Sequence, residues 1–279
     1  MNTSDFKSFH YLENGQVVFS NFTTLKSTNK LAPGSYKITY KYNREEIVIF
    51  QDRDAESAKE PIYFIQRKEI ESYLKSFSSP KTREIVNSRG FYLKGGMLLY
   101  GKEGGGKTSI SKYYYNKLIN EEGAVVFHMD QSNTIEEIWT FITQLRGIQD
   151  NLFVIMLDEI DKYMSSYEAV VKSILDGNLS LDNCFFIGVT NYIDSIPDAI
   201  KNRPSRFKYC IEIEGIQSID IIEQLITKMI GDMLKTEEIK ELALSLKGET
   251  LDTIKHQCLN MLMEVKQEKK IKKEIGFKV

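Results

Sequence analysis

The sequence predicts an α/β fold in which helices cover both faces of a parallel sheet, with a small β-rich segment before it and a helical lid after it. From about residue 90 to residue 215, short apolar strands alternate with amphipathic helices, which is typical of a buried parallel sheet. Residues 1–58 carry strand and turn signals instead. After Gly215 the strands stop, and apolar residues recur at helical spacing.

The leader, residues 1–58, is expected to form a small β-rich domain of its own. Apolar and polar residues alternate over 36–42, Ile47–Phe50 is a second apolar run, and Gln16–Phe19 is a weaker strand. Residues 52–60 are polar and strongly charged, so we interpret them as a linker. Gln66–Phe77 has helical spacing and leads into the next domain, which we expect to cover residues 59–215.

That central domain contains five apolar runs of strand length and three intervening helical patterns. The predicted strands are Met97–Tyr100, Ala124–Met129, Phe153–Leu157, Phe185–Val189 and Tyr209–Ile213. The predicted helices are Thr108–Ile119, Ile135–Leu145 and Tyr167–Leu175. Nearly continuous apolar strands of this kind are buried on both faces, so a parallel sheet flanked by helices is expected.

The C-terminal part, residues 216–279, is expected to form a helical lid with a charged tail. Isoleucine and methionine residues recur at helical spacing, and we interpret these stripes as core packing rather than as a partner groove. The tail from residue 266 onward is rich in lysine, but Glu268 and Glu274 are interleaved. Such mixed charge indicates a solvated helix end rather than a nucleic-acid-binding arm.

The composition excludes several classes of protein. With 42% hydrophobic and 27% charged residues, the chain is neither disordered nor fibrous. Its 37 Lys plus Arg against 39 Asp plus Glu disfavour a protein that coats nucleic acid non-specifically. The longest apolar runs are far shorter than the roughly 20 residues of a membrane helix. The start lacks an apolar signal segment, and three widely spaced cysteines indicate buried thiols, so a cytoplasmic protein is expected.

One glycine-rich segment carries a phosphate-binding pattern. Residues 101–108, Gly-Lys-Glu-Gly-Gly-Gly-Lys-Thr, fit G-x-x-x-x-G-K-[ST] between an apolar strand and a helix. Backbone N–H groups of such a loop surround phosphate oxygens, and Lys107 is expected to reach the β- and γ-phosphates. The predicted nucleotide-binding residues are Gly101, Gly104, Gly105, Gly106, Lys107, Thr108 and Ser109. The Thr108 hydroxyl is also a predicted Mg²⁺ ligand.

Two adjacent carboxylates follow the apolar strand Phe153–Leu157. Asp158 and Glu159 are placed by that strand at the carboxyl edge of the predicted sheet, where ligands of open α/β sheets bind. Asp158 is expected to hold Mg²⁺ and Glu159 to orient, or take a proton from, an attacking water. Asp161 is interpreted as structural.

These two motifs together resemble those of the AAA+ ATPases, in particular the AAA subgroup in its narrow sense. Residues 185–191 resemble the family's sensor-1 strand, which implies that Asn191 contacts the γ-phosphate or the attacking water. Residues 203–207, Arg-Pro-Ser-Arg-Phe, resemble the stretch whose arginines enter the neighbouring subunit's site, which implies that Arg203 and Arg206 act in trans. The resemblance covers roughly residues 66–265. It is nearest to the mitochondrial Rieske-protein translocase and to small bacterial and phage AAA ATPases.

The resemblance implies an ATPase that uses ATP and Mg²⁺ and works as a homo-oligomer, expected to be a hexameric ring. The expected role is remodelling or disassembly of a protein partner selected by the leader, without a membrane. A DNA-associated AAA+ ATPase, such as a loader or a transposition or replication regulator, is the alternative, and a monomeric P-loop kinase is a third class. The segment 130–134 lacks the aromatic pore loop of many ring translocases. Glu103 in the phosphate loop and Asp252 in the lid are further departures from the family pattern.

Overall fold

The computed structural model describes residues 9–11, 16–19, 27–28, 30–41, 46–51, 60–129 and 135–274. Contacts divide the chain into two compact units. Unit 1 takes its described residues from 1–61, 66–100 and 108–212, and unit 2 from 62–65, 101–107 and 213–279. Residues 52–59 of the predicted linker 52–60 and the segment 130–134 lie outside the described residues.

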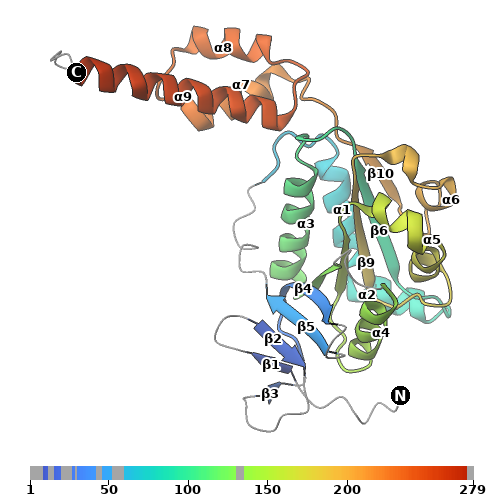
Figure 1. The fold of residues 1–279 in the computed structure, drawn as a ribbon. Coiled ribbons are helices and arrows are strands. Elements are labelled where there is room, and N and C mark those ends of the chain that lie inside the picture. The colour runs from blue at the N-terminus through green and yellow to red at the C-terminus, as the bar shows by residue number, and fades with distance from the viewer. Residues whose placement is uncertain are drawn as a thin grey trace. The chain divides into compact units, whose positions relative to one another are not determined.

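Unit 1 is built on a single ten-stranded sheet with the order β10-β6-β9-β8-β7-β4-β5-β2-β1-β3 (Figure 1). Its central strands are β6 (Lys94–Tyr100), β7 (Val125–Met129), β8 (Phe153–Leu157), β9 (Cys184–Thr190) and β10 (Tyr209–Glu212). These five and β4 (Gly34–Lys41) are parallel to one another. The predicted parallel sheet is therefore confirmed, with a sixth parallel strand taken from the leader.

The two faces of this sheet are covered by different helices, as the side chains of β9 show. Phe185 contacts Phe77 on α1 (Arg67–Phe77), with ring centroids 5.2 Å apart. Its neighbour Phe186 stacks on Trp139 of α4 (Ile135–Arg146), with centroids 6.3 Å apart. Successive strand residues point to opposite faces, so burial of both phenylalanines requires a helical layer on each side. This packing confirms the prediction that helices cover both faces of the sheet.

The leader is joined to the core through the sheet. Strand β4 pairs in parallel with β7, with Gly34 opposite Val125, and β5 (Glu46–Gln51) continues the sheet in antiparallel register. The remaining short strands are β1 (Phe9–Tyr11), β2 (Gln16–Phe19) and β3 (Ser27–Thr28). The Ser35 Oγ and His128 Nε2 atoms lie 2.8 Å apart across the β4–β7 pair, so His128 has a polar partner. The predicted separate leader therefore shares one continuous sheet with the core.

Several helices extend beyond their predicted bounds or were not predicted. The helix after β8, α5, runs from Ile160 to Asp176 with non-helical angles at Tyr167, whereas the apolar pattern indicated only its second part. Helix α2 (Pro80–Asn87) buries no residue, so it gave no apolar period to detect. The others in unit 1 are α3 (Lys107–Glu122), which begins in unit 2, η4 (Ile193–Ser195) and α6 (Asp198–Lys201). In α3, Tyr114 and Tyr115 are fully buried and belong to the core.

Unit 2 contains a three-helix bundle, as the apolar stripes predicted. Its helices are α7 (Ile219–Ile230), α8 (Thr236–Ser245) and α9 (Leu251–Glu274). Their buried face is mainly isoleucine, including Ile222, Ile226 and Ile254, which are fully buried. A Cβ on Gly215 would lie 1.9 Å from the carbonyl oxygen of Gly248, so only glycine fits where the chain enters the bundle.

The described part of the chain contains no membrane-length apolar helix, and its three cysteines differ in exposure. None of its helices combines the length and apolar character needed to cross a bilayer. Cys184 and Cys258 are buried, whereas Cys210 is exposed, so the expectation of three buried thiols is wrong for Cys210. Residue 210 lies on the edge strand β10, where only alternate side chains are covered.

Candidate active site

The predicted site residues of unit 1 follow neighbouring strands at one edge of the sheet. Strand β9 lies between β6 and β8, with Thr190 opposite Tyr100 and Gly188 opposite Leu157. Asp158 and Asn191 are the first residues after β8 and β9. The glycine-rich loop follows Tyr100 directly along the chain. Carboxyl ends of parallel strands form the ligand-binding edge of open α/β sheets, so this edge is the candidate site.

The phosphate loop, residues 101–107, has a backbone that requires its glycines. Gly101, Gly104 and Gly106 have φ values of 135°, 74° and 95°, in the region that side chains rarely allow. A Cβ on Gly101 would lie 2.4 Å from the carbonyl oxygen of Ile213. Lys107 is buried, and its Nζ donates hydrogen bonds of 2.7 Å to the carbonyl oxygens of Gly101 and Lys102. The lysine that the motif assigns to phosphate thus lies against its own loop.

Two other parts of unit 2 hold the same loop. The backbone N–H of Asp252, in the first turn of α9, donates to the Gly104 carbonyl at 3.0 Å. The Tyr63 hydroxyl donates to the Gly106 carbonyl at 3.2 Å. A Cβ on Gly104 would lie 2.8 Å from the Cβ of Asp252, so no larger residue fits there. The sequence singled out Asp252 only as a departure from the family pattern, and nothing near Tyr63 signalled its contact with the loop.

The predicted magnesium ligands have the right donor chemistry. Thr108, near the start of α3, and Asp158 are both exposed, as is Ser109. A hydroxyl and a carboxylate oxygen are hard donors of the kind that Mg²⁺ prefers. Within the described residues no group of three or more His, Cys, Asp or Glu is placed to hold a metal. One or two oxygen donors of this kind fit Mg²⁺, which usually keeps several water ligands.

Glu159 has an unusual backbone conformation. Its φ and ψ are both 49°, a left-handed conformation that costs a residue other than glycine about 1–3 kcal/mol and is enriched at functional sites. The conformation lets the chain leave β8 and begin α5 at once. The Glu159 side chain is half exposed and forms an ion pair with Lys162, with Nζ and Oε2 2.5 Å apart. The hydrogen bond to Glu159 raises the pKa of Lys162.

Asn191 lies in a turn that is fixed on both sides. The hydroxyl of the buried Thr190 donates a hydrogen bond to the Asp161 carboxylate and accepts one of 2.9 Å from the Tyr192 N–H. Asp161 belongs to the first turn of α5, two residues after Glu159. The end of β9 is thereby linked to the turn that carries Glu159.

The two arginines of the 203–207 stretch differ sharply in exposure. The side chain of Arg203 is 59% exposed, whereas that of Arg206 is 8% exposed. Arg206 donates a hydrogen bond to the Ala199 carbonyl oxygen of its own chain. Both guanidinium groups lie near Asp176, with N–O distances of 3.7 Å for Arg203 and 3.9 Å for Arg206. Arg203 thus projects to solvent, and Arg206 is turned inward.

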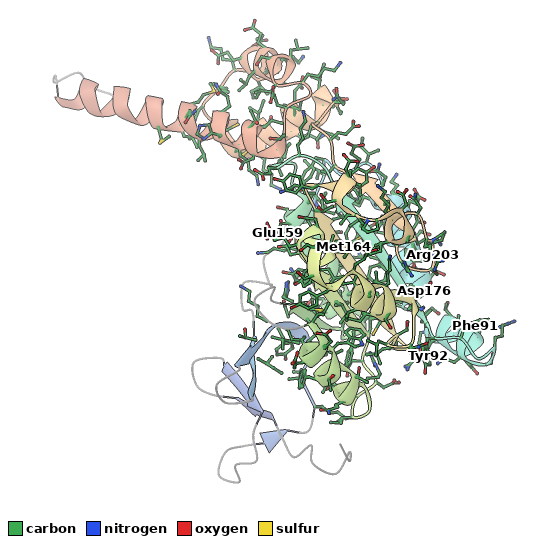
Figure 2. The ribbon with its side chains drawn as sticks, turned by 45° about the vertical axis from the view of Figure 1, so that its right-hand side comes forward. Phe91, Tyr92, Glu159, Met164, Asp176 and Arg203 are labelled. Atoms are coloured by element: carbon green, nitrogen blue, oxygen red, sulfur yellow. The ribbon has the colours of Figure 1, made fainter. Side chains whose placement is uncertain are left out.

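Asp176 was not expected to take part in this arrangement. It ends α5, and its carboxylate also accepts hydrogen bonds of 3.0 Å from Lys94 and 2.9 Å from Ser205. Burial alone raises the pKa of Asp176, but these hydrogen bonds and the nearby cations hold it below its ordinary value. An acid at a helix C-terminus opposes the helix dipole, so cations are needed to stabilise it there. Figure 2 shows Arg203 near Asp176, with Glu159 apart from them at the other end of α5.

Comparison with known proteins identifies the core domain. Residues 97–215 match the family model described as "ATPase family associated with various cellular activities (AAA)". The chain is 32% identical over 155 residues to the vesicle-fusing ATPase of Dictyostelium discoideum, covering 46% of this chain and 21% of that protein. It is 30% identical over 130 residues to the mouse protein named "ATPase family AAA domain-containing protein 2", covering 40% of this chain and 12% of that protein.

A bacterial relative covers more of both chains. The protein of Bifidobacterium dentium named "AAA ATPase forming ring-shaped complexes" is 29% identical over 164 residues, covering 50% of this chain and 31% of that protein. The chain thus spans less than a third of the length of each of these relatives. The matched segment contains the phosphate loop, Asp158, Glu159, Asn191 and both arginines. The family model and these relatives support assignment of residues 97–215 to the AAA+ ATPase superfamily.

Proposed function

We propose that this protein is a Mg²⁺-dependent ATP hydrolase that works as a homo-oligomeric ring, expected to be a hexamer, and remodels or disassembles a protein partner in the cytoplasm. The observation that carries the proposal is the left-handed Glu159, which follows Asp158 at the carboxyl end of β8. Strand β8 pairs with β9, and Asn191 is the first residue after β9. We expect an attacking water to be activated at this edge of the sheet, and the strained backbone of Glu159 supports that use.

The chain's own residues divide the proposed chemistry between them. The phosphate loop binds the phosphates through its N–H groups, and Lys107 leaves the Gly101 and Lys102 carbonyls to contact the β- and γ-phosphates. Thr108 and Asp158 hold Mg²⁺, which neutralises charge on the phosphate oxygens when it is bound. Glu159 leaves its ion pair with Lys162 and orients the attacking water, and Asn191 holds the γ-phosphate or that water.

The exposed Arg203 is the part of the proposed site that faces outward. A guanidinium that is 59% exposed is free to stabilise phosphoryl charge on another subunit, and such an arginine contributes about 10³–10⁵ in rate. Arg206 is turned inward and supports the segment 199–206 through its hydrogen bond to the Ala199 carbonyl. To contact a neighbour's nucleotide directly, the Arg206 side chain would have to rotate outward. The relative named for ring-shaped complexes supports an oligomer of this type.

The protein partner is proposed to bind through the leader strands. Because β4 is hydrogen-bonded to β7 in the same sheet as β8 and β9, a partner bound to the leader contacts a layer that is continuous with the site. The near-neutral charge of the chain favours a protein partner over a DNA-coating role.

The test of this function is ATP hydrolysis by the purified chain with Mg²⁺, in wild type and in Lys107→Ala. We expect hydrolysis in the wild type and its loss in Lys107→Ala, because no other residue of the phosphate loop replaces the lysine's charge on the phosphates. Lys102→Ala is the matched control, since Lys102 is exposed and offers only its carbonyl to Lys107. Hydrolysis stimulated by DNA at low salt, and by no protein, would favour the nucleic-acid-associated alternative.

A second prediction concerns the acid beside the phosphate loop. Replacement of Asp252 by Asn should tighten ATP binding up to roughly fivefold, because like charges about 4 Å apart in water repel by about 1 kcal/mol. The backbone hydrogen bond from residue 252 to Gly104 is kept in this variant. ATP affinity measured by titration calorimetry checks the prediction, with Asp220→Asn, in the first turn of α7, as the matched control. Unchanged or weaker affinity would show that Asp252 does not face the phosphates.

A further inference from the structure

The hydroxyl of Thr190 joins two segments that are far apart in the sequence. It is the last residue of β9, it is 1% exposed, and its hydroxyl both donates to Asp161 and accepts from the Tyr192 N–H. The hydroxyl hydrogen is thus donated to the Asp161 carboxylate, and the hydroxyl oxygen accepts the Tyr192 N–H. A buried hydroxyl with both roles satisfied has one preferred orientation, so the turn 190–192 is fixed relative to α5.

Asp161 is held on the other side of this link by the helix that it begins. It lies in the first turn of α5, where an acid is favoured by the helix dipole. The Lys162 N–H donates to the Glu159 carbonyl oxygen at 2.9 Å, so the first turn of α5 is closed around the left-handed Glu159. A displacement of Asp161 therefore changes the path of the chain at Glu159 as well.

We propose that Asp161 is a positioning residue of the active site, which acts through the Thr190 hydroxyl to fix Asn191 relative to Glu159. Asn191 is the residue between the two groups that the hydroxyl determines, Thr190 itself and the Tyr192 amide. The inference rests on the proposed ATPase function, and it adds to that function a residue that need not touch nucleotide. Its effect is on catalysis rather than on binding, because the phosphate loop is not part of the link.

The first experiment measures kcat and KM for ATP in two variants that break the link and two that keep part of it. Thr190→Val keeps the shape without the hydroxyl, and Asp161→Ala removes the acceptor. We expect both to lower kcat by about 10- to 100-fold and to change KM by less than about threefold, since a misplacement of about 1 Å at a reacting centre costs about 10²-fold. Thr190→Ser retains the hydroxyl donor, and Asp161→Asn retains an oxygen acceptor, so both variants should keep most of the activity.

The control for this series is Asp194→Ala, which removes an exposed acid from the adjacent η4 and should leave kcat unchanged. The double variant Asp161→Ala with Thr190→Val should lose no more activity than the more severe single variant, because both break the same link. Additive losses, unchanged kcat in the single variants, or a KM raised tenfold or more would overturn the proposal. If the variants that break the link fail to fold, a wild-type kcat in both Thr190→Ser and Asp161→Asn supports it, and a tenfold loss in either overturns it.

A second readout is independent of hydrolysis and separates this proposal from the proposed function. Hydrogen–deuterium exchange of the segment containing the Tyr192 amide should be faster in Thr190→Val and Asp161→Ala than in wild type and Asp194→Ala. A wild-type chain that hydrolyses no ATP would overturn the proposed function, while faster exchange would still support the link. Unchanged exchange in both variants would overturn the link itself, whatever the ATPase activity.

Discussion

Replacement of Glu159 by Gln should leave ATP binding intact and lower kcat by about 10²–10⁴, which is the usual contribution of a positioned acid–base group. Gln keeps the size of the side chain and removes its ability to take a proton from water. The ion pair with Lys162 is lost at the same time, but both groups are about half exposed, so the effect on stability is small. Steady-state hydrolysis and ATP titration check the two parts of the prediction.

The matched control is Glu168→Gln, which removes another acid of α5, partly exposed, from its ion pair with Lys172. It should leave kcat within about twofold of wild type. If ATP-bound subunits assemble as proposed, the Glu159→Gln protein with ATP should also show a larger mass by light scattering than the same protein without nucleotide. Hydrolysis at the wild-type rate in Glu159→Gln would remove Glu159 from the proposed chemistry.

Replacement of Arg203 by Ala should lower kcat by about 10³–10⁵ without changing the melting temperature by more than a few degrees. The Arg203 side chain is 59% exposed, and its ion pair with Asp176 has an N–O distance of 3.7 Å. An ion pair of so exposed a side chain contributes little to the free energy of unfolding, so its removal should cost little stability. The matched control is Lys201→Ala, which removes a cation from the same region and breaks only its ion pair with Asp198. Hydrolysis and thermal unfolding are measured on the same samples.

A mixing experiment shows whether Arg203 acts on another subunit. Arg203→Ala retains its own phosphate loop, and Lys107→Ala retains its arginine, so a mixture of the two inactive proteins should recover hydrolysis if the arginine acts in trans. A mixture that stays inactive would refute action in trans, and full activity of Arg203→Ala as a monomer would refute the ring. Arg206→Ala should differ from both by a lower melting temperature, because it removes a buried guanidinium that donates to the Ala199 carbonyl and lies near Asp176.

Much of the site was predictable because its chemistry is local in sequence. The glycines at 101, 104 and 106 have positive φ, and only their spacing with Lys107 and Thr108 was needed to expect a phosphate loop. The strand before Asp158 is apolar throughout, and its burial on both faces follows from that composition. The lid helices were likewise predicted by one-sided apolar stripes, which exist because each helix buries a single face.

Other features carried no local signal. The cluster around Asp176 draws on Lys94, Ser205 and both arginines, and Lys94, which is 82 positions from Asp176, meets it only after the sheet has formed. The inward orientation of Arg206 was not predictable either, because Arg203 and Arg206 have the same side chain and lie in one short stretch. Their difference in exposure depends on the packing of that stretch against Asp176 and the Ala199 carbonyl.

The sequence by itself determined the kind of chemistry, because glycine conformations, strand burial and helix stripes depend on neighbours a few residues away. The tertiary structure alone decided that β4 joins the parallel sheet, that Thr190 links Asp161 to the turn of Asn191, and that one arginine faces solvent. Each of these is a contact between distant segments. Such contacts depend on how the strands are arranged in the folded protein. The residues that make them have no fixed spacing in the sequence, so no sequence pattern predicts them.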